Sequence, residues 1–304
     1  MSPALSVPLS AIVIAVLVHS LWGGNPVAVK YSLLVFPPLW TAFFRFALAL
    51  ACVGLWAAMR GTRLVPRRDE WAPLALIGAL FTVQITAMNV GFDLTTGSTG
   101  AVLIATNPIF AALFAHFLIA GDRITPWKLL GLLIAFAGVA LVLMRGTGAL
   151  ELRAWGNWIV LASACLLGLR LIISARVLRR MDEARVVFWQ MLLSLPLFAL
   201  GGAAFETIRW ENMGWAPLAG IVYQGVVIAG IAFVVSFWLM KRYTPSVMVS
   251  FNFVSPVAGV LLSAWLLDDV VTPALWLGMA LVAAGLYLIA RADPAALRES
   301  ARLR

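Results

Sequence analysis

The stretch TNPIFAALFAHFLIAGDRITP at residues 106–126 returns in altered form as VSPVAGVLLSAWLLDDVVTP at residues 254–273, with Pro108 matching Pro256. A proline removes an intrahelical hydrogen bond and pushes against the carbonyl one turn back, so both copies carry the same defect. In lipid, the freed carbonyl must find a neighbouring helix, a polar side chain or cavity water. The repetition favours a pair of hinges or cavity-lining kinks, by analogy with broken transporter helices. Bland kinks remain the alternative because proline is common in membrane helices.

The internal match extends over most of the chain. Further aligned pairs are Asn107 with Ser255, Gly131 with Gly278, Gly138 with Gly285, and Arg45 with Gln190. The matched segments divide the chain into two five-helix halves, at about 9–145 and 154–291. Because each half has an odd number of spans, the second half must enter the membrane in the opposite sense to the first. This predicts an inverted-topology repeat, an arrangement typical of secondary transporters.

The composition is that of a membrane chain. Of the 304 residues, 63% are hydrophobic and 12% are charged, whereas about a quarter of the residues in a soluble domain are charged. The net charge of +9 comes from basic residues scattered through short loops, which argues against nucleic-acid binding. Cys52 and Cys165 lie in apolar runs without metal-like spacing, so we interpret both as small packing residues.

Ten apolar runs are long enough to cross the roughly 30 Å hydrocarbon layer of a bilayer as helices. They lie at about 9–32, 38–59, 71–92, 98–120, 126–145, 154–177, 185–204, 217–240, 245–267 and 272–291. Most of the 22 Lys and Arg residues fall on one side of this arrangement, and such residues are retained on the cytoplasmic side. We therefore predict an all-α membrane protein with ten transmembrane helices and both termini cytoplasmic. Its expected segments are a first repeat at 1–150, a second repeat at 151–293 and a basic cytoplasmic tail at 294–304.

The first span carries a polar stripe. In HSLWGGNPVAVK at residues 19–30, one helical face holds His19, Gly23, Pro26 and Lys30. Ionisable groups within a membrane are costly and by default functional, so we expect this stripe to face a central cavity. In the alternative interpretation Gly23 serves close helix packing alone, and His19 simply bonds a neighbour.

Two arginines lie within predicted spans. Arg45 sits roughly two turns inside the second span, where its guanidinium either clamps a carboxylate or phosphate or extends to the outer interface. Arg170 lies under about two turns from the cytoplasmic end of its span. We interpret Arg170 as an interfacial residue whose side chain reaches the surface.

Uncharged polar and aromatic groups within the spans complete the candidate site, since they can orient a solute by hydrogen bonds or stacking. The predicted solute-binding residues are His19, Trp22, Asn25, Lys30, Arg45, Gln84, Asn107, Trp189, Tyr223, Phe237, Trp238 and Asn252. The predicted hinge or kink positions are Gly23, Pro26, Pro108 and Pro256. Aromatic side chains at this frequency more often face lipid or the core, which is the competing interpretation of Trp22 and Trp189.

Several absences limit the chemistry. Every Asp and Glu falls in a loop, in the tail or near a span end, so no mid-membrane carboxylate is available for ion coupling. His19 is the candidate for any proton coupling, and facilitated transport or exchange is the alternative. No HExxH, GxSxG or P-loop pattern occurs, and the two histidines lie on different spans. We therefore expect no catalytic residue, no metal and no cofactor.

Three segments carry a family resemblance: RFALALA at 45–51, the run TNPIFAALFAHFLIAGDRITPWKLLGLLIAFAGVALVLM from 106, and its echo VSPVAGVLLSAWLLDDVVTPALWLGMALVAAGLYLIA from 254. Over nearly its whole length the chain resembles the EamA-type permeases of the drug/metabolite transporter superfamily. The resemblance implies a ten-helix transporter with a central cavity, often exporting amino acids or other small metabolites. The acidic residue after the proline-bearing helix, usually Glu in that family, is Asp122 in one copy and Asp268 or Asp269 in the other.

These observations predict a secondary transporter and not an enzyme, working by alternating access and exporting small organic metabolites. Arg45 and Lys30 favour solutes with a carboxylate, and the aromatic residues favour amino acids with large apolar side chains.

Three alternatives stay open. A drug or organic-cation exporter would belong to the same superfamily. An intramembrane enzyme acting on a lipid head group would need a second deep ionisable partner beside His19 and Arg45. A sensor or scaffold would need an output domain.

The expected partners are a small-molecule solute and the lipid bilayer, and not nucleic acid. Short loops and the lack of an organelle-targeting segment suggest a bacterial inner (plasma) membrane. The sequence leaves the oligomeric state open and is compatible with a monomer.

Overall fold

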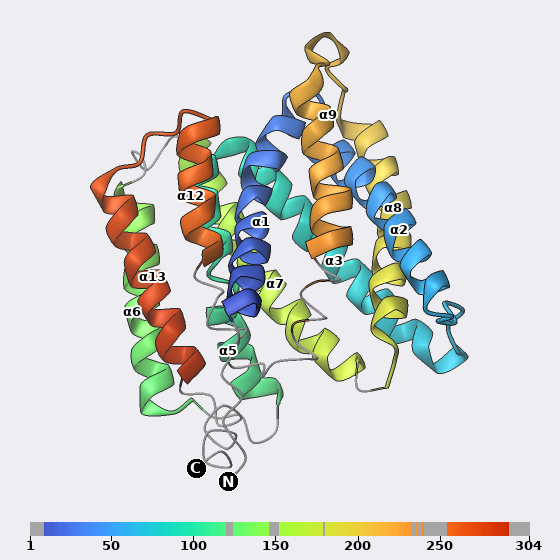
Figure 1. The fold of residues 1–304 in the computed structure, drawn as a ribbon, viewed down its shortest axis with the longest axis horizontal. Coiled ribbons are helices and arrows are strands. Elements are labelled where there is room, and N and C mark those ends of the chain that lie inside the picture. Colours follow the sequence, from blue (N-terminus) through green and yellow to red (C-terminus); the bar gives the residue numbers. More distant parts are fainter. Residues whose placement is uncertain are drawn as a thin grey trace.

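The structure, a computed structural model, describes residues 9–119, 124–145, 152–178, 180–232, 235, 239 and 254–291. Throughout these residues the chain forms helices joined by short loops, with no strand (Figure 1). Long apolar runs fold this way because a helix satisfies its own backbone hydrogen bonds where no water is available. Of the sequence-predicted site residues, Phe237, Trp238 and Asn252 lie outside the described residues, as does Asp122.

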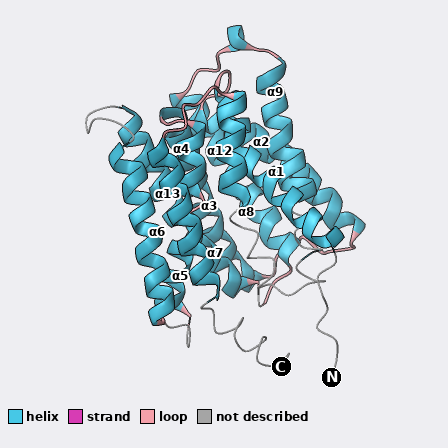
Figure 2. Cartoon of the chain, turned by 60° about the vertical axis from the view of Figure 1, so that its left-hand side comes forward, coloured by secondary structure: helices cyan, strands magenta, loops and turns pink. Residues whose placement is uncertain are grey.

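The helices follow the predicted runs closely. In chain order they are α1 (Leu9–Leu33), α2 (Pro38–Met59), the 3₁₀ turn Arg68–Glu70, α3 (Trp71–Leu94), α4 (Gly97–Ile104), α5 (Asn107–Leu118), α6 (Pro126–Arg145), α7 (Leu152–Val177), α8 (Glu183–Phe205), the 3₁₀ turn Trp210–Asn212, α9 (Trp215–Val222), the π-helix Tyr223–Ala232, α12 (Val254–Leu266) and α13 (Pro273–Arg291). The helices run along roughly one common direction (Figure 2).

Within the described residues, eight helical segments are long and apolar enough to cross a membrane. Two shorter apolar helices, Val254–Leu266 and Pro273–Ile289, lie in the predicted ninth and tenth spans. Many large apolar side chains, such as Leu55, Leu133 and Leu277, point out of the bundle. An apolar exterior of this extent marks a surface covered by lipid, so the chain is an integral membrane protein. The count of ten spans stays a prediction.

The predicted fourth span is broken at its proline. The run expected to be continuous over 98–120 forms α4, which ends at Ile104, and α5, which begins at Asn107. Pro108 stands in the first turn of α5, where no backbone N–H is needed. The Asn107 side-chain amide donates to the Ile104 carbonyl at 2.9 Å, and the Thr106 hydroxyl donates to the Leu103 carbonyl at 2.6 Å. Pro108 therefore begins a new helix. The side chains of Asn107 and Thr106 donate hydrogen bonds to backbone carbonyls next to the break.

The second proline of the repeat, Pro256, lies in α12, which the structure describes from Val254 onwards. Pro26 lies well inside α1, and the helix continues past it. Pro108 thus marks a helix start, whereas Pro26 is an internal defect.

Glycines bring helices of the two halves into close contact at one edge of the bundle, where α6 and α13 lie side by side (Figures 1 and 2). A Cβ atom on Gly138 would lie 2.6 Å from the Gly278 carbonyl, and one on Gly131 would lie 2.8 Å from the Gly285 carbonyl. The alignment pairs Gly131 with Gly278 and Gly138 with Gly285. The contact of Gly138 with Gly278 and the contact of Gly131 with Gly285 are therefore equivalent positions of the internal repeat.

A second pair of contacts also repeats. A Cβ atom on Gly23 of α1 would lie 2.6 Å from the Ser255 carbonyl of α12. A Cβ atom on Gly168 of α7 would lie 2.9 Å from the Asn107 carbonyl of α5. Asn107 and Ser255 are aligned residues, so each half places a glycine against the helix of the other half that carries the repeat proline. Gly23 is therefore a close-packing position.

Candidate functional site

Arg45 lies in the bundle interior on α2, with 6% of its surface exposed. Its guanidinium carbon lies 4.5 Å from the ring centroid of Phe46, whose ring packs edge-on against Phe81 of α3. Its Nε and Nη1 are buried and have no hydrogen-bond partner among the described residues. The side chain therefore does not extend to the surface, and it keeps at least two donors available inside the bundle.

Arg170 also points into the bundle, so its interpretation as an interfacial residue was wrong. Its Nη1 donates to Oε1 of Gln190 on α8 at 3.0 Å, and its guanidinium carbon lies 5.0 Å from the Phe81 ring centroid. The rings of Phe46 and Phe81 are 4.7 Å apart between centroids. Two guanidinium groups thus flank one pair of aromatic rings, whose faces are favourable to cations. This arrangement makes the interior electropositive and suited to an anionic group.

The middle of α1 packs against the start of the π-helix. The Tyr223 hydroxyl donates to the Leu21 carbonyl at 2.7 Å, and a Cβ atom on Gly24 would lie 2.5 Å from that hydroxyl oxygen. Pro26 cannot donate to the Trp22 carbonyl, so this stretch of α1 relies on support from its neighbours. The hydroxyl of Tyr223 is therefore engaged by the backbone of α1. One turn further, Asn25 Oδ1 is buried and has no hydrogen-bond partner among the described residues.

The residues of the polar stripe on α1 make separate contacts with different neighbours. His19 Nδ1 lies 2.8 Å from the Ala15 carbonyl of its own helix, so that nitrogen carries a proton. Lys30 Nζ donates to the carbonyls of Phe92 and Thr95 at 2.9 and 3.0 Å, and so caps the C-terminal end of α3. A cation at a helix C-terminus is favoured by the helix dipole. The face that we expected to line a cavity contacts α12 through Gly23 and α3 through Lys30.

The other predicted site residues lie apart. Gln84 is buried and donates through Nε2 to Ser163 Oγ on α7 at 3.1 Å. Asn107 donates to the Ile104 carbonyl at the break between α4 and α5. Trp22 is 38% exposed on the flank of α1. The structure thus places Asn25, Arg45 and Gln84 inside the bundle with unsatisfied polar atoms.

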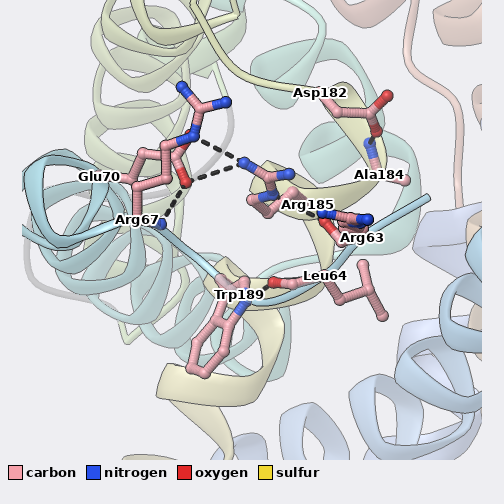
Figure 3. A network of polar contacts seen from close by, with 8 residues as sticks. All are labelled: Arg63, Leu64, Arg67, Glu70, Asp182, Ala184, Arg185 and Trp189. Carbon is pink, nitrogen blue, oxygen red and sulfur yellow. Dashed lines mark hydrogen bonds and ion pairs between the residues drawn. The ribbon is translucent and has the colours of Figure 1, made fainter.

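Trp189 belongs to a polar network at one end of the molecule (Figure 3). Its indole N–H donates to the Leu64 carbonyl at 2.6 Å, and its ring packs against Trp71. In the same network Arg185 Nη1 lies 2.8 Å from both carboxylate oxygens of Glu70, and Arg185 Nε donates to the Arg63 carbonyl. Trp189 therefore lies at the rim of the bundle, and its N–H is not available to a solute.

Two carboxylates that sequence reasoning left unassigned cap helix N-termini of the first half. Glu206, just after α8, accepts from the backbone N–H groups of Leu39 and Trp40 at 2.9–3.1 Å. Asp269 accepts from the Ser98 backbone N–H at 2.7 Å, at the start of α4. Anions are stabilised at helix N-termini by unpaired N–H groups and by the helix dipole. Within the described residues, no group of three or more His, Cys, Asp or Glu is placed to hold a metal ion.

One sequence signal could have identified Arg170. The alignment that sets Arg45 over Gln190 has a separation of 145 positions, and the same separation relates Gly23 to Gly168 and Asn25 to Arg170. Extending that register would have placed Arg170 at the level of the polar residues of α1. The capping carboxylates offered no comparable signal, because their partners are backbone groups.

Comparisons with known proteins agree with this architecture. The sequence profile of the EamA-like transporter family matches residues 9–144 and 154–291, so it matches each half once. A solved crystal structure with 23% sequence identity superposes with a TM-score of 0.67, covering 95% of this chain and 98% of its own. That similarity supports the fold.

Curated relatives span nearly the same length. An uncharacterized transporter of Archaeoglobus fulgidus is 24% identical over 88% of this chain and 93% of its own length. A probable terminal-alkyne amino-acid exporter of Streptantibioticus cattleyicolor is 29% identical over 81% of this chain and 82% of its own. The uncharacterized inner membrane transporter YedA of Escherichia coli is 23% identical over 89% of this chain and 87% of its own length.

Proposed function

The chain belongs to the EamA-like transporter family, and on that premise we propose that it exports small organic metabolites bearing a carboxylate, amino acids foremost. The proposal places it in a bacterial inner membrane as a ten-helix inverted repeat with cytoplasmic termini. The names of the Streptantibioticus and Escherichia relatives are consistent with amino-acid export and with that membrane.

The observation that carries the proposal is the buried guanidinium of Arg45. An ionised group deprived of water and of a protein partner costs several kcal/mol. A solute carboxylate would supply the missing acceptors, and the planar guanidinium matches a carboxylate in shape. The Arg170 guanidinium, which lies over the neighbouring Phe81 ring, adds to the positive potential.

The repeated contacts support alternating access. Gly23 and Gly168 each pack on a helix of the other half that carries a repeat proline, Pro256 or Pro108. Discontinuous helices inside a membrane let two halves rock around a site between them. We propose that the break near Pro108 and the equivalent segment around Pro256 are the hinges of this movement.

No carboxylate occurs in the middle of any predicted span. We therefore propose exchange or gradient-driven export without tight coupling to an ion. The expected consequence is a flux that responds to the solute gradient and is indifferent to a pH gradient.

Counterflow in proteoliposomes tests the proposal. Vesicles preloaded with one unlabelled solute would be assayed for uptake of a labelled one, using a panel of amino acids and organic cations with and without a pH gradient. We expect saturable counterflow of carboxylated solutes that falls at least about tenfold in Arg45→Ala, since loss of one charged hydrogen bond costs about 1.5–3 kcal/mol. Arg60→Ala is the matched control, because it removes the same charge from the C-cap of the same helix.

Three results would contradict parts of this proposal. Absence of flux above background for every solute would contradict the proposal that the protein is a transporter. Flux of organic cations alone, unchanged in Arg45→Ala, would identify a drug exporter with a structural arginine. Uptake driven by the pH gradient would support proton coupling, and His19 would then be the first residue to mutate.

A further inference from the structure

The two halves can be compared residue by residue at the level of the buried arginines. One separation of 145 positions relates Gly23 to Gly168, Asn25 to Arg170, and Arg45 to Gln190. The packing of Gly23 and Gly168 against aligned atoms of α12 and α5 shows that this register holds in space. Asn25 with Arg45 in the first half therefore corresponds to Arg170 with Gln190 in the second.

In the second half the pair is closed. Arg170 Nη1 donates to Gln190 Oε1 at 3.0 Å, so the arginine on α7 bonds the amide on α8. The first pair makes no such bond. Among the residues that the structure describes, Arg45 Nε and Nη1 and Asn25 Oδ1 are buried without a hydrogen-bond partner. Arg170 also has a buried Nε without a partner there, so the two pairs differ in the arginine–amide bond.

Side-chain length gives a physical reason for the difference. Each pair consists of one arginine and one amide, but the amide is Gln in the second half and Asn in the first. Asn is one methylene shorter than Gln. The combined reach of Asn25 and Arg45 is therefore smaller, and the bond that closes the second pair is not made in the first.

The aromatic surroundings of the two arginines also differ. The segment WAPLA begins at Trp71 and again at Trp215, and this register pairs Phe81 with Gly225. Phe81 supplies the ring over which Arg170 lies, whereas Gly225 has no side chain and packs against the Arg45 backbone. The ring beside Arg45 is instead that of Phe46, its own neighbour on α2. The first half thus lacks the hydrogen bond that holds the arginine of the second half, and its ring comes from a different helix.

We infer that Asn25 and Arg45 form a recognition pair for a zwitterionic solute, and that Arg170 with Gln190 is the equivalent pair closed by the protein itself. The inference rests on the proposed function and adds the solute's second group. Arg45 needs anionic acceptors and Asn25 Oδ1 needs a donor. A carboxylate with an ammonium group on the adjacent carbon supplies both, which neither a simple carboxylate nor a simple amine does.

Three probes with one side chain test the recognition of both groups. L-phenylalanine carries the carboxylate and the ammonium, 3-phenylpropionate carries the carboxylate alone, and phenethylamine carries the ammonium alone. We expect the purified full chain to bind L-phenylalanine at least about tenfold more tightly than either analogue, because each analogue leaves one buried group unpaired. Binding would be measured from ligand-induced shifts of the thermal midpoint in detergent. L-phenylalanine counterflow would be measured in proteoliposomes.

The variant Asn25→Gln tests the pair itself, because it restores the missing methylene. We expect it to close the bond to Arg45, to raise the thermal midpoint of the solute-free protein and to weaken L-phenylalanine binding at least about tenfold. A structural role for Asn25 would not raise stability while lowering affinity. Asn212→Gln is the matched control, since it lengthens an exposed amide in the Trp210–Asn212 turn.

The reciprocal variant keeps the test decisive if Asn25→Gln does not fold. Gln190→Asn should open the second pair, lower the midpoint of the solute-free protein, and leave L-phenylalanine affinity within about twofold, because the first pair is untouched. Equal affinity for 3-phenylpropionate, or unchanged L-phenylalanine affinity in Asn25→Gln, would overturn the inference. So would a Gln190→Asn variant that loses L-phenylalanine binding.

Failure of the proposed function would look different. Binding of L-phenylalanine that depends on Asn25 and Arg45, without counterflow of any solute, would support the recognition pair and overturn transport. Counterflow of carboxylates that ignores the ammonium and Asn25 would support transport and overturn the recognition pair.

Discussion

Two of the regions where the halves of this protein meet hold together by opposite physical means. Along α6 and α13 the halves meet backbone to backbone, with Gly138 against the Gly278 carbonyl. At the rim they meet through charge, where Arg185 of the second half holds Glu70 of the first (Figure 3). The first contact depends on the absence of side chains, and the second depends on their charge.

The difference suggests where movement occurs. Close glycine packing gains dispersion energy only at one helix separation, and no water can take its place without loss. Glu70 is 5% exposed, so separating its ion pair costs more than separating a surface pair, but water at the end of the bundle can replace each partner. We therefore expect α6 and α13 to stay together during transport, while the charged contacts open and close.

The largest effect is expected at the glycine contact. A Cβ atom on Gly138 would lie 2.6 Å from the Gly278 carbonyl and 2.9 Å from the Val282 backbone N, and neither backbone atom can turn away. Gly138→Ala should therefore destabilise the folded protein by about 3 kcal/mol, as overpacking does. The quantity to measure is the free energy of unfolding in detergent, from titration with a denaturing detergent.

A second glycine supplies the control for that prediction. A Cβ atom on Gly54 of α2 would have Phe188 at 3.5 Å as its nearest neighbour, which is ordinary contact. Gly54→Ala should be neutral or stabilising by up to about 1 kcal/mol, since alanine is the better helix former. If both variants were equally stable, α6 and α13 would not be held by close glycine packing, and the contrast with the rim would disappear.

An intermediate effect is expected at the rim. Glu70 is 5% exposed, and Arg185 contacts both of its carboxylate oxygens at 2.8 Å. A double-mutant cycle with Glu70→Gln and Arg185→Gln should give a coupling energy of about 1–2 kcal/mol. Salt should weaken this coupling, because the contact lies at the end of the bundle.

The same cycle can be run on a weaker pair. Arg60 and Glu183 are 3.4 Å apart and more exposed than the first pair, so their coupling should be below about 0.5 kcal/mol. Effects of Glu70→Gln and Arg185→Gln that simply add would show that the two residues do not hold the halves together.

The sequence predicted the repeat and most helix positions well, since apolar length and matched prolines reflect local physics. The break at Ile104 was not predicted, because Pro108 can kink a helix or begin one, and Asn107 decides through its bond to the Ile104 carbonyl. Lys30 was predicted to face a central cavity, but its partners at the end of α3 lie 62 and 65 positions away in the sequence. Such contacts depend on tertiary packing, which periodicity does not encode.

Arg170 is a second example of a residue whose contacts depend on tertiary packing. Counting turns from the end of its span gave its depth, but depth does not tell which neighbour a long side chain meets. Gln190 on α8 and Phe81 on α3 decide that its guanidinium turns inward. The repeat register held that information, because it pairs Arg170 with a polar residue of α1.

The smallest effect is expected at another charged contact between the halves, where Glu206 caps α2. Burial raises the pKa of this carboxyl above its usual value of 4.5, and the nearby Asp93 raises it further. The backbone N–H groups of Leu39 and Trp40 and the charge of Arg209 act in the opposite direction. The net shift is upward, so the folded protein holds this proton more tightly than the unfolded chain does.

The sign of the pH dependence follows from that shift. The stabilisation from Glu206 is complete below the usual carboxyl pKa and is lost as the pH rises through the raised pKa. Glu206→Gln cannot titrate, so its stability relative to wild type should improve between about pH 4 and about pH 7, by about 2 °C in thermal midpoint. Glu211→Gln, an exposed acid in the same loop, should show no such trend. If wild type instead gained on Glu206→Gln with rising pH, capping of α2 by the ionised carboxylate would outweigh its burial.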